Sequence, residues 1–147
     1  MTAPCRRLIA TVLLVVYATF PRSGEHAYWY ARFTGRRWAS HFLTYAGGSI
    51  SPTTFEWEYS GGITLDHSDP SIVYLSRQVG GSFQIERWIT EDGGNRWRHH
   101  VVVRGGALDN VRPVVPRGSH GGPMSLLWLR GDYINYRSYR TQIAYLR

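Results

Sequence analysis

Residues 90–97 read TEDGGNRW and stand between SFQIERWI and RHHVVV, two runs with strand-like alternation of apolar residues. Such alternation is typical of half-buried strands, so the stretch predicts a hairpin turn. A tight hairpin needs only residues that tolerate positive φ, which Gly93 and Gly94 supply. Asp92 can also accept hydrogen bonds from the amides of the turn, and Trp97 can fill the space beneath it. The stretch therefore predicts a small folded module, of a kind that usually recurs as a repeat.

The same succession of strands and turns recurs along the chain. A first unit holds TVLLVVYATF, AYWYARF and ASHFLTYA; a second holds YSGGITLD, SIVYLSR, SFQIERWI and RHHVVV; a third holds NVRPVVPRG, MSLLWLRG and YINYRSYRTQI. The turn TGRRW (34–38) of the first unit occupies the place of TEDGGNRW and also ends in Trp, although it lacks the Asp. No run shows helical spacing with caps, so an all-β fold is expected.

Four-stranded meanders that repeat at this spacing are typical of β-propeller blades. A β-sandwich also has short strands at regular intervals, but the repeated turn favours the propeller. We expect an N-terminal extension over 1–11 and a partial propeller of about two to three blades over 12–147. Propellers typically have about four blades or more. The chain is therefore expected either to associate with its own copies through open blade edges, or to be a piece of a longer protein.

The N-terminal stretch MTAPCRRLIATVLLVVYATF admits two interpretations. A basic start and a short apolar run are typical of a signal peptide, and the run is too short for a transmembrane helix. No small-x-small cleavage site follows, and β-branched and aromatic residues dominate the run. AYWYARF (27–33) can serve as its hairpin partner, so we favour a buried strand. The single cysteine, Cys5, excludes an internal disulfide and leaves the compartment open.

All the positively charged side chains of the chain, histidine aside, are arginines. All 17 basic residues are arginine and the net charge is +7. Arginine binds carboxylate, sulfate or phosphate with two hydrogen bonds, so nucleic acid and acidic polysaccharide are the candidate partners. There is no basic run, RNP-like aromatic motif or zinc-finger spacing, which disfavours nucleic acid. The adjacent His99 and His100 point to opposite faces of a strand, which argues against one metal site. No cofactor is expected.

The pattern T-x-D-x-G-x-x-W, formed by Thr90, Asp92, Gly94 and Trp97, resembles the Asp-box of sialidase-type BNR repeats. Longer stretches resemble the BNR-4 type repeat proteins, namely VVYATF with EHAYWYARF, YSGGITLDHSDPSIVYLSR, IERWITEDGGNRW, and NVRPVVPRG with LLWLRGDY. That family consists of seven-bladed propellers and includes ulvan lyases, rhamnose–glucuronate lyases and glycosidases that act on similar glycans. The resemblance extends from about Val12 onward. It implies a secreted or periplasmic parent protein that cleaves acidic, uronate-containing polysaccharide by a lyase or glycosidase mechanism.

The strand order sorts the loops by end, because alternate connections of a meander lie at opposite ends of the sheet. HSDP (67–70) should share the end of TEDGGNRW. The other end should collect the polar residues that flank the remaining connections, which are Glu25, His26, Tyr59, Arg77, Asn110, Arg112, Asp132 and Tyr133. Propellers bind their ligands at such a face. We therefore expect the functional site there.

These residue types suit eliminative cleavage of a uronate chain. Arg77 or Arg112 could bind the carboxylate and stabilise the enolate charge that develops on it. His26 and Tyr59 could act as base and acid, in an order that remains open. Further predicted contacts to the glycan come from Tyr133, as a second donor or stacking surface, and from Asn110. Glu86 is an additional polar candidate.

Three other interpretations remain open. The chain could be a non-catalytic carbohydrate-binding protein or an inactive remnant. It could be a sialidase-like exo-hydrolase, a class that uses an arginine triad with a Tyr–Glu pair and an Asp, although the expected arginine motif near the N-terminus is absent. The candidate residues could also be structural, with the tyrosines packed and the arginines paired with carboxylates such as Asp109 or Asp132.

Overall fold

A computed structural model describes residues 13–118 and 124–147. Within these residues, ten strands form three antiparallel sheets, so the prediction of an all-β fold is confirmed. The first sheet contains β1 (Leu14–Arg22), β2 (Glu25–Phe33) and β3 (Trp38–Gly47). The second contains β4 (Ile63–Leu65), β5 (Ile72–Val79), β6 (Ser82–Ile89) and β7 (Arg98–Val103). The third contains β8 (Asp109–Val114), β9 (Leu126–Asn135) and β10 (Ser138–Leu146), and a short 3₁₀ helix spans Thr54–Glu56.

Each sheet is a meander in which consecutive strands pair. β1 pairs with β2, and Tyr17 lies opposite Trp29, as expected for the apolar run and AYWYARF. The strand interpretation of that run thus holds from Leu14 onward, while the predicted extension over 1–11 lies outside the described residues. The predicted hairpin of the third sheet is wrong in its position. β9 continues through Asp132 and Tyr133, and the chain turns at Tyr136–Arg137 instead.

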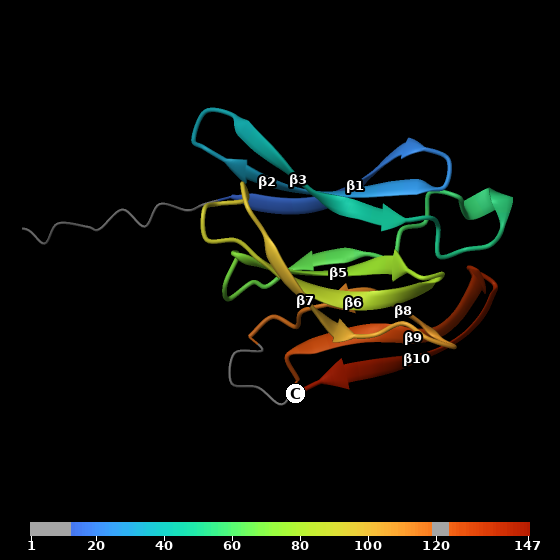
Figure 1. Ribbon diagram of the computed structural model, residues 1–147. Helices are drawn as coiled ribbons and strands as arrows, with labels where there is room; N and C mark the ends of the chain where they lie inside the picture. The colour runs from blue at the N-terminus through green and yellow to red at the C-terminus, as the bar shows by residue number, and fades with distance from the viewer. Residues whose placement is uncertain (1–12, 119–123) are drawn as a thin grey trace, which may run out of the picture.

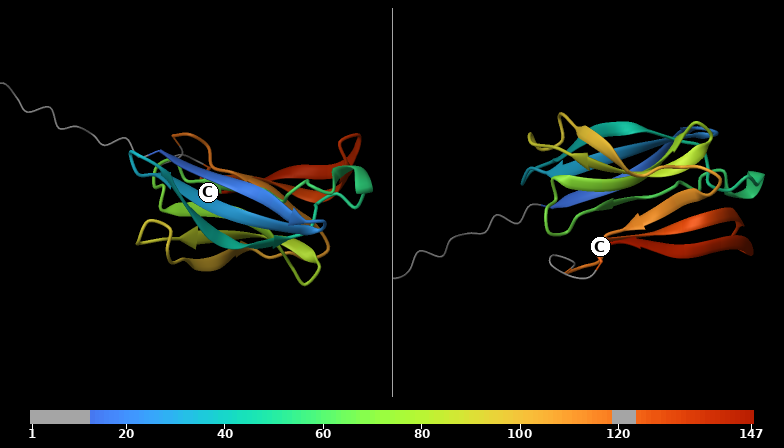
Figure 2. Two further views of the ribbon diagram at one scale, coloured as in Figure 1. Left: turned by 90° about the horizontal axis from the view of Figure 1, so that it is seen from above. Right: turned by 60° about the horizontal axis from the view of Figure 1, so that its bottom comes forward.

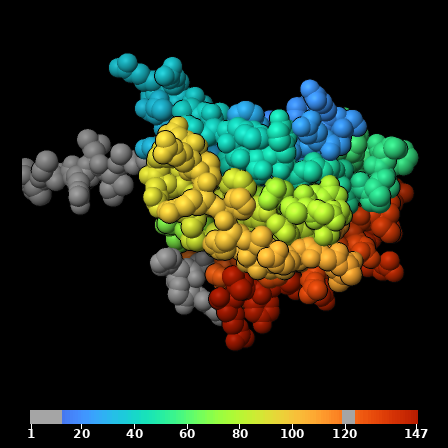
Figure 3. Space-filling view, in the orientation of Figure 1, coloured from blue at the N-terminus to red at the C-terminus, as the bar shows by residue number. Residues whose placement is uncertain are grey.

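The three sheets pack face to face in chain order (Figures 1 and 3). Between the first and second sheets lie Tyr28, Tyr30, Leu43, Ala46, Val73, Leu75 and Trp88. Between the second and third sheets lie Ile72, Tyr74, Ile85, Val115, Leu126 and Trp128. Along one side of the stack β4 contacts both β1 and β8. The second sheet is therefore buried on both faces, which explains the nearly continuous apolar run of β5.

The TEDGGNRW turn joins β6 and β7 and has the folded geometry expected from its residues. Asp92 Oδ1 accepts hydrogen bonds from the amides of Asn95 and Arg96, both at 2.9 Å. The Trp97 indole donates to the Gly94 carbonyl at 2.9 Å, and its ring lies 5.2 Å from that of Tyr30 on β2. Gly94 has φ 108°, and a Cβ there would come within 2.9 Å of the Tyr30 ring. Through Gly94 and Trp97 the turn thus packs against Tyr30 and fills space between the first and second sheets.

Candidate functional site

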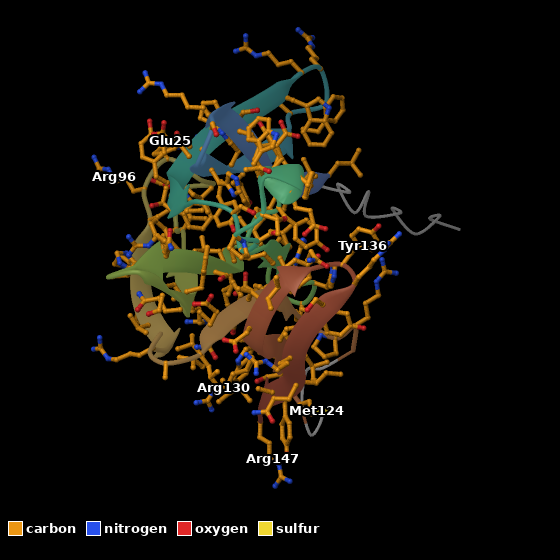
Figure 4. The ribbon with its side chains drawn as sticks, turned by 90° about the vertical axis from the view of Figure 1, so that its right-hand side faces the viewer. Glu25, Arg96, Met124, Arg130, Tyr136 and Arg147 are labelled. Atoms are coloured by element: carbon orange, nitrogen blue, oxygen red, sulfur yellow. The ribbon has the colours of Figure 1, made fainter. Side chains whose placement is uncertain are left out.

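The connections predicted to share one end do so. The hairpins β1–β2, β5–β6 and β9–β10 lie at the end opposite the TEDGGNRW turn, together with the segment that links β3 to β4 (Figures 1 and 2). Figure 4 looks onto this end, where Glu25 begins β2 and Tyr136 stands on the β9–β10 turn. The link from β3 to β4 includes the 3₁₀ helix and brings Tyr59 to the third sheet.

Arg112, Tyr59 and Tyr133 form one cluster at this end. The guanidinium carbon of Arg112 lies 4.0 Å from the centre of the Tyr59 ring, and that ring lies 5.1 Å from the ring of Tyr133. Arg112 has φ 57°, the one non-glycine residue with positive φ in the described chain, and its amide donates to the Gly61 carbonyl. Strain of this kind persists only where the surroundings enforce it. The backbone of β8 therefore holds the arginine over the ring.

The 3₁₀ helix adds a carboxylate to the cluster. Glu56 Oε1 lies 3.4 Å from the Tyr133 hydroxyl, which donates to it, and 3.3 Å from the amide of Tyr136. Burial, together with the neighbouring Tyr59 and Glu56, raises the pKa of Tyr133 to about 12. The hydroxyl of Tyr133 therefore keeps its proton at neutral pH and acts as a hydrogen-bond donor.

A second arginine–tyrosine pair lies on the other side of Glu56. The guanidinium carbon of Arg137 lies 5.1 Å from the centre of the Tyr136 ring, on the β9–β10 turn. Opposite it, Phe55 is 91% exposed. These residues help to line a cleft of about 360 Å³ between the 3₁₀ helix and the turn. A neighbouring cleft of about 300 Å³ is lined by Ser49, Ile50, Pro52, Gln78, Phe83, Asp109, Asp132, Tyr133 and Ile134.

His26, a predicted acid or base, lies at this end but inside the protein. Its imidazole is fully buried, and Nε2 lies 2.9 Å from the carbonyl oxygen of Trp57, to which it donates. The Phe20 ring packs edge-on against it at 4.7 Å. Burial lowers the pKa of His26, so the ring is held in its neutral form. Its position secures the Trp57 segment, and solvent does not reach it.

Arg77, a predicted carboxylate binder, is engaged by a carboxylate of the protein itself. Its Nη2 donates to Glu86 Oε1 at 2.7 Å, and its Nε lies within 3.1 Å of both Glu86 oxygens. Gln84 and Trp88 also donate to Glu86, at 2.6 and 2.9 Å. Burial opposes ionisation of Glu86, but these hydrogen bonds outweigh it and lower the pKa. Arg77 on β5 and Glu86 on β6 thus form an ion pair within the second sheet, on the side that faces the first sheet.

Asn110, a predicted glycan contact, points into the core. Its amide donates to the carbonyls of Arg104 and Phe83 and accepts from the Trp128 indole at 3.0 Å. Asp132 is partly exposed and pairs with Arg140. Of the predicted site residues, the structure therefore gathers Tyr59, Arg112 and Tyr133 into one accessible cluster. The roles assigned to His26, Arg77 and Asn110 stay predictions, and their contacts are those of structural residues.

Sequence reasoning missed the acidic and aromatic residues that complete the cluster. Glu56 and Phe55 belong to the stretch SPTTFEWEY (51–59), and Tyr136 and Arg137 belong to the hairpin that was misplaced. A dense mixture of aromatic and acidic residues in a connection between strands was the available signal. Such residues have no packing role in a strand, and they indicate a surface built for contact.

The described residues include no group of three or more His, Cys, Asp or Glu side chains arranged to hold a metal ion. They also include no helix of the length and apolar character needed to cross a membrane. Comparison with known protein families, with curated proteins and with solved structures finds no match.

Proposed function

We propose that the chain binds an acidic oligosaccharide, of the uronate-containing class, on the surface formed by Tyr59, Arg112 and Tyr133. The observation that carries this proposal is the Arg112 guanidinium held 4.0 Å above the Tyr59 ring. A guanidinium is a bidentate partner for a sugar carboxylate, and aromatic faces offer apolar area to the C–H faces of sugar rings. The arginine is partly exposed and is not among the residues that form ion pairs in the described chain.

The second pair, Arg137 on Tyr136, supports an oligomer over a single sugar. It repeats the arginine–tyrosine arrangement across Glu56, and the exposed Phe55 ring extends the aromatic surface. Two cations along one surface suit a ligand that carries carboxylates on successive residues. Because Glu56 lies between them, the ligand should place a neutral group there, such as a sugar hydroxyl, between one carboxylate and the next.

The architecture agrees with this proposal. We take the three stacked meanders as consecutive blades of a BNR-type propeller, with TEDGGNRW as an Asp-box. Three facts support this: the face-to-face stacking in chain order, the contacts of β4 with β1 and β8 along one side, and the hydrogen bonds of Asp92. In such folds the ends of the blades carry ligand sites.

Binding is supported better than eliminative cleavage. Cleavage requires both a base and an acid that reach the substrate, and His26, one member of the predicted pair, is enclosed beneath the Trp57 segment. Arg77, the predicted alternative to Arg112 for binding the carboxylate, is already bound by Glu86. The accessible groups are instead a cation, aromatic rings and a protonated hydroxyl, which together recognise a ligand.

Titration calorimetry with an oligomer of glucuronic acid, and with its carboxyl-reduced analogue, tests the proposal. We expect the acid to bind and the neutral analogue to bind at least about tenfold more weakly, since a charge-assisted hydrogen bond contributes about 1.5–3 kcal/mol. R112Q should reduce this preference, because Arg137 is then the remaining cation of the surface. R36Q is the matched control, because exposed Arg36 lies on the β2–β3 turn at the opposite end. Equal affinity for the acid and its neutral analogue would refute the proposal.

A sialidase-like hydrolase is the second candidate, and the Tyr133–Glu56 contact favours it. That class combines arginines with a Tyr–Glu pair, and here the Tyr133 hydroxyl donates to Glu56 at 3.4 Å. A fluorogenic ketoside of a sugar acid would test this candidate. Release of the fluorophore by the native chain and its loss in Y133F would replace simple binding with hydrolysis.

A further inference from the structure

The outward face of the first sheet is almost entirely apolar and aromatic. Register assigns its residues: Val15, Tyr17, Thr19, Ala27, Trp29, Ala31, Phe33, Trp38, Ser40, Phe42 and Tyr45. We call this set the aromatic face. Its rings contact one another, with centroids 5.5 Å apart for Trp29 and Phe42 and 5.0 Å apart for Phe42 and Tyr45. Figure 2, left, looks down on this sheet.

The outward face of the third sheet is also apolar. Trp128 and Ala144 pack toward the second sheet, so their neighbours along β9 and β10 point outward. The outward set is Val114, Leu127, Thr141, Ile143 and Tyr145, and we call it the aliphatic face. Leu129 is not part of it, because it packs against the buried cluster of Ile50, Phe83 and Val111. Ile143 is 73% exposed and Phe42 on the aromatic face is 43% exposed.

None of the residues named for the two faces is charged, although the chain has 17 arginines and a net charge of +7. Charged residues that the register places on the same sides, such as Glu25 and Asp109, stand at the start of β2 and of β8. An antiparallel sheet that faces water normally alternates apolar and polar residues. Here both sides of the first sheet have the apolar composition that is typical of a buried side, as both sides of the second sheet do. Contiguous apolar surface of this extent is rare on monomeric proteins and marks a site of contact.

We propose that the aromatic face of one copy of this chain packs on the aliphatic face of a second copy. This contact continues the stacking already present, in which each sheet is covered by the next with strands along a common direction and aromatic rings set against aliphatic side chains. An aromatic-to-aromatic contact would cover one face and leave the other in water. The aromatic-to-aliphatic contact covers both faces on every copy with a single type of interface, and repeating it closes a ring if the rotation permits. The surface that this contact would cover is a sheet face, whereas the sequence led us to predict association through strand edges.

Light scattering on a size-exclusion column, over a range of concentrations, tests the proposal with the full chain. We expect masses above that of one chain. Because both faces are apolar and the copies carry like charge, association should strengthen with salt. F42E and I143E should each raise the dissociation constant about tenfold or more, which corresponds to about 1.4 kcal/mol. F55E is the matched control, since Phe55 is exposed but belongs to neither face.

Mixing the two variants distinguishes this contact from a symmetric one. F42E keeps its aliphatic face and I143E keeps its aromatic face, so an equimolar mixture should form pairs that neither variant forms alone. Unchanged circular dichroism would show that both variants fold. A native chain that stays at the mass of one chain at every concentration would overturn the proposal. So would a mixture that fails to pair, or a single variant that pairs as well as the native chain.

Discussion

At the scale of the residue, the turn that ends in Trp97 stabilises the contact between two sheets. The indole is partly buried against Tyr30 and donates to the Gly94 carbonyl. W97A should therefore lower the free energy of unfolding by about 3 kcal/mol, near the lower end for loss of a large aromatic side chain. Urea denaturation followed by far-UV circular dichroism measures the change.

Trp38 supplies the control for that substitution. It ends the shorter turn of the first sheet but is 49% exposed. W38A should cost less than about 1 kcal/mol, as is usual for a surface side chain. A W97A midpoint no lower than that of W38A would mean that the turn is not a structural plug.

Asp92 makes stability depend on pH in a defined direction. The amide of Arg96, the Thr90 hydroxyl and the amide of Asn95 together hold the pKa of Asp92 below its usual range, although desolvation opposes them. A carboxyl with a depressed folded-state pKa contributes stability above its unfolded pKa of about 4, and this contribution is lost as pH falls through the folded value. The Tm of D92N should thus lie below the native Tm at neutral pH, and the difference should shrink below about pH 4. A constant difference from neutral to acid pH would contradict this role.

At the scale of the element, β5 and β6 are joined by the Arg77–Glu86 ion pair as well as by their backbone hydrogen bonds. Glu86 is fully buried, whereas the Arg77 side chain is 27% exposed. R77A leaves the carboxylate buried without its cation and should destabilise the protein by about 3 kcal/mol. The double variant R77A/E86Q also removes the unpaired buried carboxylate, so it should recover part of the stability that R77A loses. An R77A protein as stable as the native chain would show that the pair is dispensable.

The same pair shows where sequence reasoning reaches its limit at this scale. Alternation identified the strands, and the order of the meander assigned Arg77 to the correct end. The pattern could not reveal that Glu86, two residues from Trp88 and opposite Leu75, would turn its carboxylate toward that guanidinium. Pairing across strands depends on register, and a shift of one residue would have moved Glu86 to the other face.

At the scale of the whole molecule, the sequence was sufficient to predict the all-β class and the end of the sheets at which Tyr59, Arg112 and Tyr133 lie together. Periodicity and turn residues are local signals, and they predicted the three meanders. The cluster depends on distant contacts, such as Tyr133 with Glu56, which are 77 positions apart. The misplaced third hairpin hid Tyr136 and Arg137, because Gly131 looked like a turn residue while it lies within β9 at φ 142°.

The central claim is the location of a glycan-binding surface at the Tyr59–Arg112–Tyr133 end. An amide nuclear magnetic resonance titration with an oligomer of glucuronic acid tests it most directly. We predict that the shifts will concentrate in residues 55–61, 110–112 and 132–137. The opposite end offers a clear competitor, because Arg96 and Arg98 line a cleft there beside Trp97. Shifts that concentrate in residues 89–98, or no shifts at saturating ligand, would contradict the account.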